Sequence, residues 1–140
     1  MNKTFRTLTL STALALAALG QPALAGTGDP LFINMTADEA HRVSMALNFG
    51  AKQQALGHPL TLFLNDKGVM VGAKANAKQY PEQQKAIADI LAKGGMVIVC
   101  PMCMKHYGVK EEDLLPGLVL GKPELTGAAL FKDNTKTLTW

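Results

Sequence analysis

Met96-Val-Ile-Val-Cys100-Pro-Met-Cys103-Met-Lys-His-Tyr-Gly108 is the stretch that decides the fold of this 140-residue chain. Its first four residues are apolar and mostly β-branched, a pattern typical of a strand that is buried on both faces. Pro101 has the fixed φ that suits the first position of a helix, and Gly108 can take the left-handed conformation that ends one. We therefore predict a strand that ends at Cys100, followed by a short helix that closes at Gly108.

Both cysteines of the protein lie in this stretch. At the start of the predicted helix, unpaired backbone N–H groups and the positive end of the helix dipole favour a thiolate on Cys100. Cys103 lies one turn later on the same face of the helix. Lys105 and His106 follow closely and add positive charge or hydrogen-bond donors. Cys100 and Cys103 are therefore the candidate reactive residues, and Lys105, His106 and Gly108 are expected to support them.

The first 25 residues have the features of a secretory signal peptide. Lys3 and Arg6 form a basic start, residues 8–19 form an apolar run, and Ala23-Leu24-Ala25 is a small-x-small cleavage site. The apolar run is short for a membrane span, and no later segment reaches its length. We expect cleavage near Gly26, a periplasmic location, and no membrane attachment once the signal has been removed.

Residues 26–140 are long enough to form one domain with a core of its own. Without Lys3 and Arg6, 12 basic residues stand against 11 acidic ones, and no basic stripe with interleaved aromatics remains. Nucleic acid is therefore not an expected partner. The glycines form neither a dinucleotide fingerprint nor a phosphate loop, so no nucleotide cofactor is expected.

The spacing of the two cysteines argues against a structural disulfide as their main purpose. A bridge across so short a loop contributes only about 2 kcal/mol to stability. A Cys-x-x-Cys pair is better explained by redox exchange, sulfur transfer or metal binding.

Strand and helix patterns alternate through the domain, which predicts a mostly parallel α/β sheet with helices between the strands. In such sheets, functional sites form at the carboxyl ends of strands, where Cys100 lies. Thr36-Ala-Asp-Glu39 has the residues of a capping box for the first long helix. The turn at residues 65–68 leads into a loop that leaves the sheet at the same end as Cys100, so this loop could wall the site. The expected strands are residues 31–35, 60–64, 96–99, 118–120 and 135–140, and the expected helical segments are residues 38–56, 81–93, 101–107, 123–131 and a turn within 109–115.

Val99-Cys100, an eight-residue step to Gly108 and the acidic run that follows resemble the DsrE/DsrF-like family, which includes small sulfur-relay proteins. The order of elements, the Asp66-Lys-Gly68-Val69 turn and a final strand after Asn134 extend the resemblance over most of the domain. The resemblance implies a single flavodoxin-like domain that assembles into homo-oligomers, either trimers or hexamers. It also implies that Cys100 carries a persulfide.

The leading interpretation of the site is sulfur carriage by an exported member of this family. The Cys100 thiolate accepts sulfane sulfur as a persulfide, and Cys103 resolves or releases it. Such a protein is a sulfur carrier or sulfurtransferase rather than a turnover enzyme. It requires no cofactor, and its expected partners are a sulfur donor or acceptor protein.

Three alternatives remain open at this point. Cys-Pro-x-Cys is also the right local motif for thiol–disulfide exchange. A periplasmic soft-metal site, chiefly for Cu(I), would draw on soft donors crowded into seven residues. The candidate ligands for this metal are Cys100, Met102, Cys103, Met104 and His106. An oligomeric domain with an inert disulfide is the third alternative.

Overall fold

The computed structural model describes residues 28–140, so the expected signal peptide lies outside the described residues. Within this range, five strands form one sheet in the order β4-β3-β2-β1-β5, and every neighbouring pair is parallel. The predicted α/β class with a parallel sheet and flanking helices is confirmed. The strands are β1 (Leu31–Met35), β2 (Leu60–Leu64), β3 (Met96–Val99), β4 (Val119–Leu120) and β5 (Lys136–Thr139).

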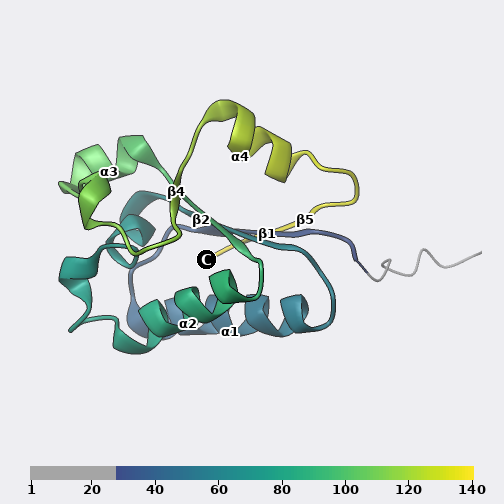
Figure 1. The fold of residues 1–140 in the computed structure, drawn as a ribbon, viewed down its shortest axis with the longest axis horizontal. Helices are drawn as coiled ribbons and strands as arrows, with labels where there is room; N and C mark the ends of the chain where they lie inside the picture. The colour runs from purple at the N-terminus through teal and green to yellow at the C-terminus, as the bar shows by residue number, and fades with distance from the viewer. Residues whose placement is uncertain (1–27) are drawn as a thin grey trace, which may run out of the picture.

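Helices cover both faces of the sheet (Figure 1). The long helices α1 (Ala40–Ala55) and α2 (Pro81–Ala92) pack together on one face, and α4 (Pro123–Leu130) lies on the other. The chain crosses the sheet in one direction from β1 to β4 and then returns past β1 to β5, so right-handed connections place α4 opposite α1 and α2. None of the helices within residues 28–140 is long and apolar enough to span a membrane.

The carboxyl end of the sheet carries the shorter helices. The chain leaves β3 directly into α3 (Pro101–Tyr107), which packs against the 3-10 helix η1 (Asp66–Met70) that follows β2. Two further 3-10 turns, η2 (Lys74–Asn76) and η3 (Glu111–Asp113), lie in the connections. The short helix from Pro101 and the left-handed cap at Gly108 (φ 71°) are confirmed.

The main core lies between the sheet and the layer of α1 and α2. Ile33, Leu62 and Val97 stand in one row across β1, β2 and β3, and all three are fully buried. Full burial of one such side chain stabilises the fold by roughly 1.5–3 kcal/mol. The opposite face holds a smaller cluster, in which the rings of Phe32 and Phe63 lie 6.2 Å apart. Packing on both faces holds β3 as an interior strand between β2 and β4, and with it the position of the residue that follows.

The predicted capping box before α1 is wrong. The Thr36 hydroxyl donates to the backbone carbonyl of Trp140 at 2.7 Å, and the Thr36 backbone N–H donates to the same oxygen. Glu39 is the residue before α1 and makes no side-chain capping bond. Because β5 pairs with β1, the end of the chain competes for Thr36 and delays the helix to Ala40.

Candidate functional site

Cys100 is held rigidly between β3 and α3. Its backbone N–H donates to the carbonyl of Leu64 on β2 at 2.9 Å, which continues the sheet by one bond. Its own carbonyl accepts from the Met104 backbone N–H at 3.0 Å, which is the first bond of the helix. Cys100 itself has an extended backbone, and Pro101 takes the first helical position. The residue is therefore fixed by a strand on one side and a helix on the other.

The two sulfur atoms are in direct contact. The Cys103 backbone N–H donates to Cys100 Sγ at 3.3 Å, and Cys103 Sγ donates to Cys100 Sγ at 2.7 Å. Both cysteines are free and half-buried, and a disulfide would bring the sulfurs to about 2.05 Å. Cys100 is thus the acceptor in both contacts, and Cys103 is the donor.

The surroundings of Cys103 favour its protonated form. Burial raises the pKa of the Cys103 thiol, and its hydrogen bond to Cys100 raises this pKa further. A hydrogen bond from the backbone of Asp66 acts in the opposite direction. The sulfur pair therefore consists of a Cys103 thiol that donates and a Cys100 sulfur that accepts.

The 3-10 helix η1, which follows β2, packs against α3 at the carboxyl end of the sheet. Tyr107, the last residue of α3, donates its hydroxyl hydrogen to Asp66 Oδ1 at 2.5 Å. This hydrogen bond is the main cause that raises the pKa of Tyr107 to about 12. Asp66 has a positive φ of 46°, which is uncommon outside glycine. Sequence analysis assigned no role to either residue, although the parallel sheet brings the ends of β2 and β3 together.

The other predicted residues lie around α3 without converging on the sulfurs. Met102 is 82% exposed, whereas Met104 is 4% exposed and belongs to the core. Lys105 and His106 are exposed, and the His106 ring packs edge-on against Tyr107 with centroids 4.7 Å apart. Among residues 28–140, no group of three or more His, Cys, Asp or Glu side chains is placed to hold a metal ion. Cys100, Cys103 and His106 are therefore not placed to hold one metal ion together.

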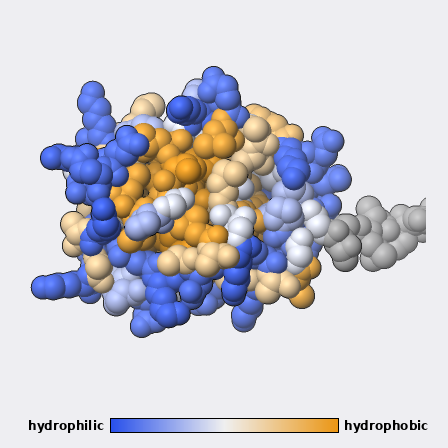
Figure 2. All heavy atoms as spheres, in the orientation of Figure 1, coloured by the Kyte–Doolittle hydropathy of each residue, from blue (hydrophilic) through white to orange (hydrophobic). Residues whose placement is uncertain are grey.

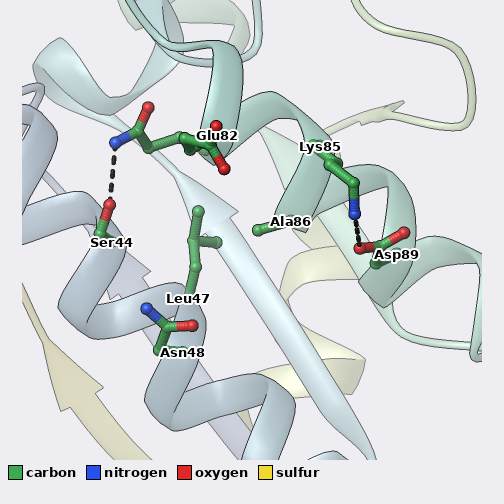
Figure 3. Close-up of a pocket in the computed structure, with 8 residues that line it drawn as sticks. Ser44, Leu47, Asn48, Glu82, Lys85, Ala86 and Asp89 are labelled. Atoms are coloured by element: carbon green, nitrogen blue, oxygen red, sulfur yellow. Dashed lines mark hydrogen bonds and ion pairs between the residues drawn. The ribbon is translucent and has the colours of Figure 1, made fainter.

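A separate pocket of about 180 Å³ lies between α1 and α2 (Figure 3). Its polar side chains bond to one another: Gln83 donates to the Ser44 hydroxyl at 2.8 Å, and Lys85 pairs with Asp89 at 2.9 Å. Neither cysteine lines this pocket. The Gln83–Ser44 hydrogen bond joins the two helices, whereas Lys85 and Asp89 both belong to α2.

Residues 30–136 match the DsrE/DsrF-like family over most of the described chain. The chain belongs to this family. It is 34% identical over 80 residues to the uncharacterized protein MJ0989 of Methanocaldococcus jannaschii, across 56% of this chain and 70% of that protein. It is 30% identical over 80 residues to the uncharacterized protein MK0008 of Methanopyrus kandleri, across 56% of this chain and 66% of that protein.

Two solved structures share the fold of this DsrE/DsrF-like protein. The protein of unknown function MTH1491 from Methanobacterium thermoautotrophicum superposes with a TM-score of 0.66, at 13% identity, over 79% of this chain and 98% of that one. The ychN protein from E. coli superposes with a TM-score of 0.58, at 16% identity, over 81% of this chain and 99% of that one. At these identities, the likeness concerns the fold alone.

Proposed function

We propose that this protein is an exported sulfur carrier that holds sulfane sulfur as a persulfide on Cys100. The observation that carries the proposal is the pair of contacts in which Cys100 Sγ accepts from the Cys103 backbone N–H and from the Cys103 thiol. Donors aimed at one sulfur stabilise negative charge on it, and negative charge is what a sulfur nucleophile needs. Membership of a family that includes sulfur-relay proteins supports the same assignment.

The loading step needs no external oxidant or reductant. The Cys100 thiolate attacks the sulfane sulfur of a polysulfide or of a donor protein's persulfide. A new sulfur–sulfur bond forms at Cys100, the donor's sulfur–sulfur bond breaks, and the donor leaves as a thiolate or shortened polysulfide. Cys103 keeps its proton during this step and stabilises the attacking sulfur by its hydrogen bond. A sulfur donor protein and an acceptor protein are the partners that this chemistry requires.

The first prediction is that Cys100, and not Cys103, accepts the sulfur. Reduced protein treated with polysulfide should gain mass in steps of one sulfur atom, and peptide mapping should place the adduct on Cys100. The Cys100→Ser variant should not load. The Cys103→Ser variant should load and should hold the persulfide longer, because the thiol that releases it is gone.

Two outcomes of this experiment would contradict sulfur carriage. Equal loading of the two single variants would mean that the thiols are chemically equivalent. Failure of the wild-type protein to load, together with its oxidation to a Cys100–Cys103 disulfide, would favour thiol–disulfide exchange instead. The 2.7 Å contact between the sulfurs makes this the second candidate function, because little movement separates the pair from a disulfide.

Export is the second prediction, and it rests on the signal-like composition of residues 1–25. Expressed in a Gram-negative host, the protein should be recovered from the periplasm without these residues, as measured by the mass of the intact chain. Lys3 and Arg6 form the basic start of the signal, so replacing both with Glu should reduce export. Recovery of the full-length chain from the membrane would contradict this proposal.

A further inference from the structure

Asp66 and Tyr107 form a bridge between η1 and the end of α3. The hydrogen bond between them spans 41 positions of the sequence and is the side-chain link between η1 and α3. It lies at the surface, where a hydrogen bond adds little to the stability of the fold. Because the bridge lies close to Cys103, it also affects the position of that residue.

The turn that carries Asp66 is held against β1 by backbone contacts. Asn65 donates its backbone N–H to the carbonyl of Met35 at 2.9 Å, and Gly68 donates to the carbonyl of Asn65 at 2.9 Å. Gly68 packs so closely that an added Cβ would lie 2.3 Å from the Met35 oxygen. The base of the turn is therefore set by β1, and the Tyr107 hydroxyl sets its outer end.

This arrangement places Cys103 between two partners. Its sulfur donates a hydrogen bond to Cys100 Sγ, and the backbone of Asp66 lowers the pKa of the Cys103 thiol. Tyr107 meanwhile donates to the Asp66 carboxylate, whose negative charge raises the pKa of Cys103. The hydrogen bond from Tyr107, one helical turn after Cys103, thus ties the part of α3 that carries Cys103 to η1.

We propose that Asp66 and Tyr107 are positioning residues that hold Cys103 for the release of sulfur from Cys100. This inference rests on the proposed persulfide function. In the release step, Cys103 gives up its proton to solvent and its thiolate attacks the inner sulfur of the Cys100 persulfide. The Cys100–Cys103 disulfide forms, the bond to the outer sulfur breaks, and hydrosulfide leaves. An external thiol then reduces the disulfide.

The test separates release from loading. The wild-type protein is loaded with polysulfide, freed of excess reagent and followed for hydrosulfide production and for the Cys100–Cys103 disulfide by mass spectrometry. The ratio of release rate to loading rate should fall about fivefold in Tyr107→Phe and in Asp66→Gly, the effect of losing one positioning hydrogen bond. Glycine adopts the positive φ of residue 66 readily, so Asp66→Gly removes the carboxylate and keeps the backbone turn.

Two further variants serve as controls. Asparagine tolerates the left-handed conformation and keeps the Oδ1 acceptor, so Asp66→Asn should restore the ratio to at least the wild-type value. Asp89→Asn breaks the exposed ion pair with Lys85 and should leave the ratio unchanged. Folding of every variant is checked by circular dichroism.

The possible failures are distinguishable. If the wild-type protein does not load, the proposed function fails and this inference fails with it. If the wild-type protein loads and releases sulfur while Tyr107→Phe and Asp66→Gly keep the wild-type ratio, the positioning role alone is wrong. A reduced ratio that Asp66→Asn does not restore would also overturn it, because a retained acceptor would then have no effect.

Discussion

At the scale of single residues, Gly68 sets where the wall of the sulfur site lies. A Cβ at this position would stand 2.3 Å from the carbonyl oxygen of Met35 and 3.1 Å from its carbonyl carbon. Both are backbone atoms of β1, so neither can move aside as a flexible side chain would. We expect Gly68→Ala to lower the free energy of unfolding by about 1–3 kcal/mol, as overpacking against backbone generally does.

Urea unfolding measures this effect, and Gly127→Ala in α4 is the matched control. An added Cβ at Gly127 would meet only the edge of the Phe131 ring at 3.9 Å. Removing a glycine from a helix interior stabilises it by about 0.5–1 kcal/mol, so this variant should unfold at a higher urea concentration. A Gly68→Ala protein that unfolds at the wild-type midpoint would show that the turn adjusts at no cost.

The residues of the site divide into those that sequence could predict and those that it could not. Cys100, Cys103 and Gly108 belong to one continuous stretch, and their local geometry follows from Pro101 and the strand before it. Asp66 and Tyr107 meet only because β2 and β3 are neighbours in the sheet. Neither residue type carries a pattern that points to the other across 41 positions. Such a pair becomes visible once the pairing of strands is known.

At the scale of elements, apolar runs predicted the strands well and local motifs predicted a helix start less well. The apolar runs at 31–35 and 60–64 form strands that are buried under α1 and α2. An apolar run indicates a segment that will be buried, so these strands were predictable. The Thr36 capping box failed because a long-range partner, the Trp140 carbonyl, took the hydroxyl. Helix capping is a local signal, and a tertiary hydrogen bond of similar strength overrides it.

The inner face of α2 also carries contacts that local sequence patterns do not predict. Gln83 and Gln84 are buried although their side chains are polar. Gln84 donates to the carbonyls of Val71 and Ala73 at 3.1 and 2.8 Å, which ties the loop after η1 to the helix. Buried amides are stable where their hydrogen bonds are made, but a sequence pattern does not indicate which carbonyls are within reach.

At the scale of the whole molecule, the two faces of the sheet are covered unequally. The face under α1 and α2 is sealed, whereas α4 on the other face has no buried residue. Met96, Val119 and Phe131 are 38%, 39% and 81% exposed. Figure 2 shows apolar side chains gathered near the middle of the viewed face, over the β4 edge of the sheet and framed by polar ones. An unpaired edge with apolar surface is a site where chains associate.

We therefore expect a second copy of this chain to cover the β4 edge, as part of the proposed trimer or hexamer. Light scattering should give a mass that is three or six times that of the processed chain at micromolar concentration. A charged lysine on an edge strand opposes association, so Val119→Lys should shift the protein towards the monomer. Leu56→Lys places the same charge at an exposed apolar residue after α1, away from β4, and should leave the mass unchanged. A wild-type monomer, or equal effects of the two lysines, would mean that the β4 edge does not mediate assembly.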